Sequence, residues 1–190
     1  MLDKKQIRQI YLEKRNQIGS NEKQIFDNKL FDSTIKSEIF KKHDIILAYY
    51  PVKNEPNILP IIEYAISIGK KVAFPICNTK DYELTFKFIN DLNDLVNGAY
   101  NIPEPREDAK DYSYEIEALC IVPALSFDKR GYRIGYGKGF YDRFLSRFNG
   151  VSIGLCYNDF LCEELPIDVT DQAVDVIITD KEVLYVKRKV

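Results

Sequence analysis

Two kinds of apolar spacing alternate along this chain, and the alternation predicts its fold. Short runs that are almost entirely apolar, such as residues 44–50 and 118–122, are typical of strands buried on both faces of a sheet. Longer segments with apolar residues at helical spacing are typical of helices that cover such a sheet. We predict helices at residues 3–18, 21–40, 58–68 and 138–148, and strands at 44–50, 71–75, 83–89, 118–122, 151–157, 174–179 and 183–186.

Strands that alternate with helices indicate an α/β fold, in which a mainly parallel sheet has helices on both faces. Residues 90–111 are rich in turn-forming residues and are expected to be mostly irregular. Ligands bind beyond the carboxyl ends of the strands in this architecture. We therefore expect the loops after Tyr50, Val122 and Tyr157 to converge, which would bring Glu55 towards the segment that follows Val122.

The first predicted helix carries two stripes at ~100° per residue. An apolar stripe is expected to dock the helix on the body of the protein, and it consists of Ile7, Ile10 and Ile18. The adjoining stripe is mostly cationic, and it consists of Lys4, Arg8, Tyr11 and Arg15.

Composition limits the kinds of partner that the chain can have. The 190 residues include 29 acidic and 27 basic ones, so the chain has no overall basic field for nucleic acid and any attraction for phosphate must be local. No apolar leader follows Met1, and no run approaches the ~18 apolar residues of a membrane helix. We expect a single cytoplasmic domain over residues 1–190, a monomer that acts on small molecules, with neither nucleic acid nor a membrane as a partner.

Cysteine and histidine are too few, and too widely spaced, for several common kinds of site. The four cysteines form no CxxC pair and no zinc spacing, so they are expected to be reduced thiols. The single histidine, His43, excludes a histidine-rich metal cage and a histidine-based triad, and it is expected to complete the end of a helix.

The segment 123–145, PALSFDKRGYRIGYGKGFYDRFL, carries the strongest chemical signal. Four glycines lie within nine residues, and five cations are interleaved with them or flank them: Lys129, Arg130, Arg133, Lys138 and Arg143. A glycine loop between a strand and a helix can turn its N–H groups towards a phosphate, which nearby cations then neutralise. The spacing fits neither a Walker A loop nor the dinucleotide fingerprint, and a flexible surface turn is the alternative interpretation.

Several motifs occur in a fixed order along the chain. They are Lys4-Lys5-Gln6-Ile7-Arg8 with Arg15, Tyr50-Pro51 with Glu55, Ile102-Pro103-Glu104-Pro105, the pattern FD-x-x-G-x-R-x-G-x-G-x-G-[FY]-Y-D from Phe127 to Asp142, and Pro166, Asp171 and Val174-Asp175 before Ile177-Ile178-Thr179. In these motifs the chain resembles the 5-formyltetrahydrofolate cyclo-ligases, also called methenyltetrahydrofolate synthetases, over most of its length. The resemblance implies a Rossmann-like α/β fold and closure of 5-formyltetrahydrofolate to 5,10-methenyltetrahydrofolate at the expense of ATP, with Mg²⁺.

The resemblance also implies roles for individual residues. ATP would be contacted by Lys4, Lys5, Gln6, Ile7, Arg8, Arg133, Ile134, Gly135, Tyr136, Gly137, Lys138, Gly139, Phe140 and Tyr141. The folate would be contacted by Val52, Glu55, Asn57, Tyr136, Gly137, Lys138, Gly139 and Phe140. Asp142 and Asp171 would hold Mg²⁺. Tyr136 stands where many members have Arg, so it is open whether this side chain stacks on the pteridine or pairs with phosphate, and Asn57 stands where an acidic residue is frequent.

The chemistry is also consistent with the residues themselves. A formamide oxygen is a poor leaving group, and its phosphorylation makes it a good one. Phosphoryl transfer depends on positioning and charge neutralisation, which Lys138, Arg133 and the loop N–H groups can supply, so the two side chains are the candidate catalytic residues. Mg²⁺ prefers one or two carboxylates together with phosphate oxygens. Tyr49, Tyr50, Phe140 and Tyr141 are candidates to line a pteridine slot.

Each of these residues also has a structural interpretation. Asp142 could complement a helix dipole, Asp171 could cap a turn, and Lys4 with Arg8 could form a solvated helix face. Two other functions remain open at the level of sequence: a sugar-phosphate isomerase-like enzyme on a similar sheet, and a non-catalytic regulator that binds folate or nucleotide.

Overall fold

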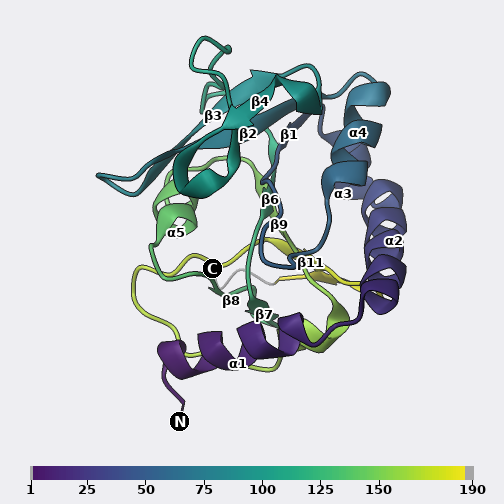
Figure 1. The fold of residues 1–190 in the computed structure, drawn as a ribbon, viewed down its shortest axis with the longest axis vertical. Coiled ribbons are helices and arrows are strands. Elements are labelled where there is room, and N and C mark those ends of the chain that lie inside the picture. The colour runs from purple at the N-terminus through teal and green to yellow at the C-terminus, as the bar shows by residue number, and fades with distance from the viewer. Residues whose placement is uncertain (1, 187–190) are drawn as a thin grey trace.

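The computed structural model describes residues 2–186 (Figure 1). Its helices are α1 (Lys4–Asn16), α2 (Ser20–Lys36), α3 (Glu38–Lys42), α4 (Leu59–Ser67) and α5 (Phe140–Leu145). Its strands are β1 (Ile45–Leu47), β2 (Lys71–Asn78), β3 (Glu83–Ile89), β4 (Leu95–Asn97), β5 (Pro103–Pro105), β6 (Leu119–Val122), β7 (Ser126–Asp128), β8 (Arg133–Ile134), β9 (Val151–Leu155), β10 (Leu161–Cys162), β11 (Val176–Ile178) and β12 (Val183–Tyr185).

A seven-stranded sheet in the order β12-β11-β9-β6-β1-β2-β3 forms the centre of the protein. The five inner strands, from β11 to β2, pair in parallel, and the edge strands β12 and β3 pair antiparallel to their neighbours. The inner strands are buried on both faces, which explains their continuous apolar runs. The predicted α/β fold with a mainly parallel sheet is therefore confirmed.

The helices lie on both sides of this sheet, with α2, α3 and α4 along one side and α5 on the other (Figure 1). The helix α4 packs on β2, and α5 packs on β3. At the base of the molecule, α1 lies beside a second, three-stranded sheet in the order β10-β7-β8. No helix within residues 2–186 is long and apolar enough to span a membrane.

The predicted helix 21–40 is in fact two helices, because the backbone at Ser37 is extended, with φ −67° and ψ 141°. The Ser37 hydroxyl accepts the N–H of Phe40 at 3.2 Å and so caps α3. His43 ends α3, where its Nδ1 lies 2.7 Å from the carbonyl oxygen of Ile39, in agreement with the expected helix-end role. The predicted helix 138–148 is shorter than expected, because Gly139 adopts a left-handed conformation and α5 ends at Leu145.

The strand 118–122 was predicted to lead directly into the glycine loop, and this prediction is wrong. The hairpin β7–β8 intervenes, and the carboxylate of Asp128, which is fully buried, organises its turn. This carboxylate accepts the N–H groups of Arg130 at 2.9 Å, Tyr132 at 3.0 Å and Leu165 at 3.0 Å. Residues 90–111 are less irregular than predicted, because β4 and β5 pair there as a two-stranded sheet.

Candidate active site

The glycine loop, residues 135–139, connects β8 to α5. Gly137 and Gly139 have φ of +90° and +70°, values that residues with a Cβ rarely adopt. None of the backbone N–H groups from Gly135 to Phe140 donates a hydrogen bond to another residue within 2–186. Because α5 has only six residues, its dipole contributes little. Attraction for an anion must therefore come from these free N–H groups and from neighbouring cations.

The side chain of Arg8 lies directly against this loop. Its Nε donates to the carbonyl oxygen of Gly135 at 2.9 Å. A Cβ added at Gly137 would stand only 3.1 Å from the guanidinium carbon of Arg8, so this position has no room for a side chain while Arg8 holds its place. Arg8 and the glycine loop were each predicted to contact ATP, and this hydrogen bond brings the two together.

The docking face of α1 is partly the one predicted, since Ile7 and Ile18 pack on apolar clusters, but it differs at Ile10 and Arg15. Ile10 is 46% exposed, whereas Arg15, from the cationic stripe, is only 2% exposed. Arg15 Nη2 donates to the carbonyl oxygens of Ala124 at 2.6 Å and Leu125 at 3.1 Å. The helix thus turns its cationic stripe inward, because unpaired backbone carbonyls under it need donors.

The other residues at the start of α1 cap the helix, pack on the body of the protein or are exposed. The side chain of Gln6 accepts the N–H of Asp3 at 3.0 Å, while Asp3 accepts the N–H of Gln6 at 2.7 Å, so the two form a capping box. Ile7 packs on the apolar cluster formed by Leu125, Ile134 and Leu165, and Lys5 is exposed.

Arg133 and Asp142 form a shielded ion pair at the base of the loop. Arg133 Nη2 lies 2.8 Å from Asp142 Oδ1, and the side chains are 5% and 25% exposed. Burial lowers the pKa of Arg133, and the charge of Asp142 opposes this effect. Gln172 also takes part, because its N–H donates to Asp142 Oδ1 at 3.1 Å and its carbonyl oxygen accepts from Arg133 Nη1 at 2.8 Å.

Lys4 pairs with two carboxylates on the turn formed by residues 168–171. Its Nζ lies 2.7 Å from Asp168 Oδ2 and also donates to Asp171 Oδ2. Burial alone would lower the pKa of Lys4, but the hydrogen bonds and charges of Asp168 and Asp171 outweigh it and raise that pKa. The turn is fixed further by the N–H of Asp168, which donates to Asp171 Oδ2 at 2.7 Å.

Asp142 and Asp171 are suited to Mg²⁺ only if the substrates supply further ligands. Asp142 accepts the N–H of Gln172, the residue after Asp171, and the charges of both carboxylates raise the pKa of Arg133 against the effect of burial. Both offer the hard carboxylate oxygens that Mg²⁺ prefers. No group of three or more potential metal-ligating side chains occurs within residues 2–186, so a dedicated protein cage is absent there. Two carboxylates completed by phosphate oxygens and water fit the usual Mg²⁺ site of phosphoryl-transfer enzymes.

Lys138 is the exposed cation of the loop. Its Nζ stands 5.3 Å from the ring centroid of Tyr82, and no ion pair within the described chain involves it. Arg143, one turn into α5, donates to the carbonyl oxygens of Lys138 and, at 2.9 Å, of Tyr82. The ring of Phe140 meets that of Tyr82 edge-on, with 5.6 Å between centroids. These contacts fix the backbone around Lys138 while its ammonium stays available.

Glu55, in the loop after β1, is buried and only 3% exposed. Its Oε2 accepts the N–H of Val52 at 2.9 Å, whereas its Oε1 is buried with no hydrogen-bonding partner among residues 2–186. Burial raises the pKa of Glu55, and the Val52 N–H, Arg15 and Tyr136 offset only part of this effect. Lys53 Nζ covers the ring of Tyr136 at 4.8 Å from its centroid.

The hydroxyl of Tyr141 is also buried without a hydrogen-bonding partner in the described chain. Burial raises its pKa well above the usual value, and Cys120, Cys77 and Glu55 add to this effect. Buried polar atoms are nearly always hydrogen-bonded in proteins, so Tyr141 and Glu55 together mark a place where a bound molecule would supply partners.

Asn57 lies at the start of α4, where its Oδ1 accepts the N–H of Leu59 at 3.2 Å and its own N–H donates to Asp27 at 2.9 Å. It lines a cavity of about 540 Å³ with residues of α2, among them Asp27. These contacts give Asn57 a structural role, and its folate contact stays a prediction.

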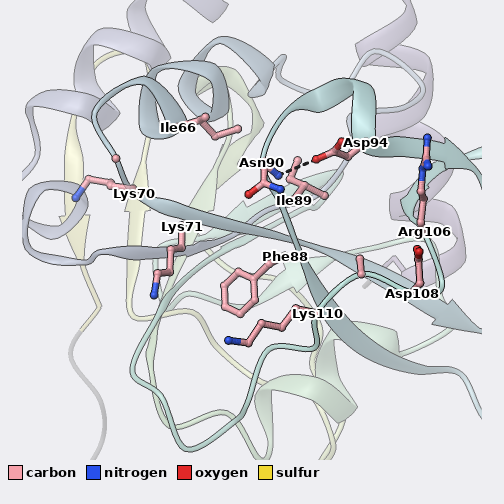
Figure 2. Close-up of a pocket in the computed structure, with 12 residues that line it drawn as sticks. Ile66, Lys70, Lys71, Phe88, Ile89, Asn90, Asp94, Arg106, Asp108 and Lys110 are labelled. Atoms are coloured by element: carbon pink, nitrogen blue, oxygen red, sulfur yellow. Dashed lines mark hydrogen bonds between the residues drawn. The ribbon is translucent and has the colours of Figure 1, made fainter.

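A larger cavity, of about 690 Å³, lies elsewhere, where α4 ends and β2 begins (Figure 2). Phe88 forms part of its wall, and Lys71 and Lys110 extend beside that ring. None of the residues predicted to bind ATP, folate or metal lines it. Cavity size alone would therefore have pointed away from the glycine loop.

Several residues of this site were not predicted from the sequence. Gln172 acts through its backbone and leaves no sequence signal. Tyr82 reaches the loop from the turn between β2 and β3, and its contact is equally invisible in sequence. Arg143 was named among the cations of the glycine segment but was given no role at the site, although it lies four residues after Gly139, on the same face of the helix.

Comparison with known proteins shows which proteins this chain is similar to. The family described as the 5-formyltetrahydrofolate cyclo-ligase family matches residues 1–180. A 5-formyltetrahydrofolate cyclo-ligase of Mycoplasma genitalium is 31% identical over 182 residues, which cover 94% of this chain and 98% of the relative. A probable 5-formyltetrahydrofolate cyclo-ligase of Caenorhabditis elegans is 26% identical over 194 residues, which cover 95% of this chain and 94% of that protein.

A solved structure shows the same relationship in three dimensions. The NMR structure of the 5,10-methenyltetrahydrofolate synthetase of Aquifex aeolicus superposes with a TM-score of 0.86 at 29% identity, covering 98% of this chain and 94% of that one. The resemblance inferred from the sequence motifs is thereby confirmed. With a family match over nearly its whole length and a fold shared with a solved synthetase, this chain belongs to the 5-formyltetrahydrofolate cyclo-ligase family.

Proposed function

We propose that this protein closes 5-formyltetrahydrofolate to 5,10-methenyltetrahydrofolate and couples the closure to the conversion of ATP to ADP and phosphate. The observation that carries the proposal is the contact of Arg8 with a glycine loop whose N–H groups are free, next to the paired Arg133 and Asp142. Free N–H groups and cations on one loop support the binding of a polyphosphate.

The proposed reaction has two steps. The formyl oxygen attacks the γ-phosphorus of ATP, and the bond from that phosphorus to the β–γ bridging oxygen breaks, so that ADP leaves. The N10 amine then attacks the activated carbon and loses its proton. The bond between this carbon and the phosphorylated oxygen breaks last, and phosphate departs with the oxygen that had belonged to the formyl group.

The catalytic residues in this scheme are Lys138 and Arg133. Lys138 is placed to neutralise the charge that moves onto the phosphate oxygens, because its ammonium is exposed and has no carboxylate partner in the described chain. Arg133 already pairs with Asp142, and it can hold this carboxylate in place while the phosphates bind. The other loop residues, from Ile134 to Tyr141, would contact ATP mainly through their backbone.

Asp142 and Asp171 would hold Mg²⁺, together with phosphate oxygens. When bound there, the ion would neutralise the phosphates and leave the γ-phosphorus open to attack. Asp171 Oδ2 and Asp142 Oδ1 are the oxygens that hold Lys4 and Arg133, so a metal would share these carboxylates with the two cations.

The folate would lie on the side of the loop where Val52, Glu55 and Tyr136 meet. Glu55 Oε1 lacks a partner among residues 2–186, and donors on the pteridine would satisfy it. Tyr136 is covered on one face by Lys53 and lies close enough to Glu55 to affect its pKa. These contacts favour a place for Tyr136 beside the pteridine rather than on a phosphate.

Mixing the protein with 5-formyltetrahydrofolate and Mg-ATP tests the proposal directly. We expect absorbance of the methenyl product to appear, with one ADP formed per product, and neither signal when ATP is omitted or replaced by an analogue with a non-transferable γ-phosphate. Binding of both substrates without product would instead identify a non-catalytic regulator, and it would refute the proposed activity.

A further inference from the structure

Glu104 lies on β5, in the motif Ile102-Pro103-Glu104-Pro105, and the phosphate chemistry leaves it without a role. Its side chain is buried, at 8% exposure, and no ion pair within residues 2–186 involves it. Its Oε1 accepts the N–H of Cys77 at 3.1 Å, and the side chain also interacts with the Cys77 thiol. Burial and the charge of Glu104 raise the pKa of the Cys77 thiol to about 12. A buried carboxylate without a cation is costly unless donors are supplied from elsewhere.

Glu104 lies near the carboxyl ends of the parallel strands, where ligands bind in this architecture. The last residues paired between β1 and β2 are Leu47 and Ala73. Beyond Ala73, the edge of β2 that faces β1 is therefore not paired with β1. Glu104 bonds to Cys77 on this edge, four residues further towards the carboxyl end of β2. Glu104 therefore lies at the same end of the parallel strands as the loop that carries Glu55.

Buried polar atoms without partners lie in the same region. The hydroxyl of Tyr141 and Oε1 of Glu55 have none among the described residues, and Glu55 lies close enough to Tyr141 to help raise the pKa of its hydroxyl. Cys77, which bonds to Glu104, also contributes to the raised pKa of Tyr141. Glu104 and Glu55 thus flank one region in which a ligand would supply the missing hydrogen-bonding partners.

The backbone next to Glu104 is shaped around its carboxylate. A Cβ added at Gly98 would stand 2.5 Å from Glu104 Cδ and from Oε2, so a side chain at this position would displace the carboxylate. Between the two residues, Tyr100 meets Phe140 edge-on, with 6.5 Å between ring centroids. This contact ties the segment of Glu104 to the end of the glycine loop.

We propose that Glu104 is a substrate-recognition residue, which accepts hydrogen bonds from the 2-amino group and the N3–H of the pteridine. This inference rests on the proposed function. The two groups are adjacent donors on one edge of the ring, an arrangement that a carboxylate can accept bidentately. The formyl group on N5 must face the phosphates at the glycine loop. The 2-amino edge lies at the opposite end of the bicyclic ring, which suits the carboxylate outside the loop, whereas Glu55 meets Tyr136 within it.

The test compares wild-type protein, Glu104→Gln and the control Glu107→Gln, which changes an exposed carboxylate of the same segment. Dissociation constants are measured by calorimetry for 5-formyltetrahydrofolate and for an analogue with a methyl group in place of the 2-amino group. We expect Glu104→Gln to weaken binding of the natural folate by about 10- to 100-fold, the effect of a lost charge-assisted hydrogen bond. The KM for ATP and the affinities of Glu107→Gln should stay within about twofold of wild type.

The analogue makes the assignment specific. Wild-type protein should bind it about 10- to 100-fold more weakly than the natural folate, whereas Glu104→Gln should bind the two about equally. Gly98→Ala should reproduce the loss, because its methyl group displaces the carboxylate. Wild-type affinity for both folates in Glu104→Gln would overturn the assignment of Glu104 alone. If that variant fails to fold, equal binding of the two folates by wild-type protein overturns it as well. Wild-type protein that binds no folate would refute the proposed function and this inference together.

Discussion

Replacement of Lys138 by Met tests the catalytic role of the loop most sharply, because the structure separates stability from activity at this position. The ammonium is exposed, and the contact it makes is with the ring of Tyr82, 5.3 Å away. Loss of an exposed cation–π contact costs about 0.5–1 kcal/mol. For a chain of this size that corresponds to a fall in Tm of about 1–4 °C. The fold should therefore be retained.

The effect on turnover should be much larger. A charge that acts mainly in the transition state lowers kcat rather than substrate affinity when it is removed. We expect kcat to fall ~100-fold, or about 2.7 kcal/mol, with the KM values for ATP and folate little changed. Lys29→Met, which removes an exposed cation of α2, is the matched control and should behave as wild type. A kcat for Lys138→Met within about twofold of the control at saturating substrates would refute the catalytic role.

Three further substitutions test other parts of the site. Asp142→Asn should raise the Mg²⁺ concentration needed for half-maximal activity and, because Arg133 loses its ion pair, lower the unfolding free energy by about 1–3 kcal/mol; an unchanged Mg²⁺ titration would exclude the metal role. Arg8→Ala should raise the KM for ATP about tenfold and leave that for folate nearly unchanged, whereas equal increases would indicate lost packing of α1. Glu55→Gln should weaken folate binding yet stabilise the fold by about 1–3 kcal/mol at neutral pH. Burial raises the folded pKa of Glu55, so the stability contributed by its neutral form is complete below the unfolded pKa of 4.5 and is lost as the pH rises through the folded pKa. The unfolding free energies of wild type and Glu55→Gln, measured with denaturant, should therefore differ by an amount that grows from about pH 4 to pH 7. A difference that does not change with pH would contradict this explanation.

The elements that depend on local pattern were predictable from the sequence. The inner strands are buried on both faces, so their apolar runs identified them. The glycine loop was predictable because Gly137 must combine a positive φ with the close approach of Arg8, and glycine alone satisfies both.

The features that were not predicted correctly depend on contacts between residues distant in sequence. The hairpin β7–β8 relies on Asp128, one of whose hydrogen bonds comes from Leu165, 37 positions away. The docking face of α1 was predicted only in part, because the burial of Arg15 depends on the carbonyl oxygens of residues 124 and 125, acceptors that no periodicity in α1 can reveal. The environment of Glu104 could not be predicted for the same reason, because its hydrogen bond from Cys77 depends on the packing of β5 on β2.

The central claim is that the formyl oxygen itself is phosphorylated, and the fate of this oxygen tests it most directly. The protein is given Mg-ATP and 5-formyltetrahydrofolate whose formyl oxygen carries a heavy-isotope label, and the released phosphate is analysed by mass spectrometry. We expect one labelled oxygen in each phosphate formed, in step with the methenyl product. Methenyl product accompanied by unlabelled phosphate would show that ATP is hydrolysed by water instead, and it would contradict the account.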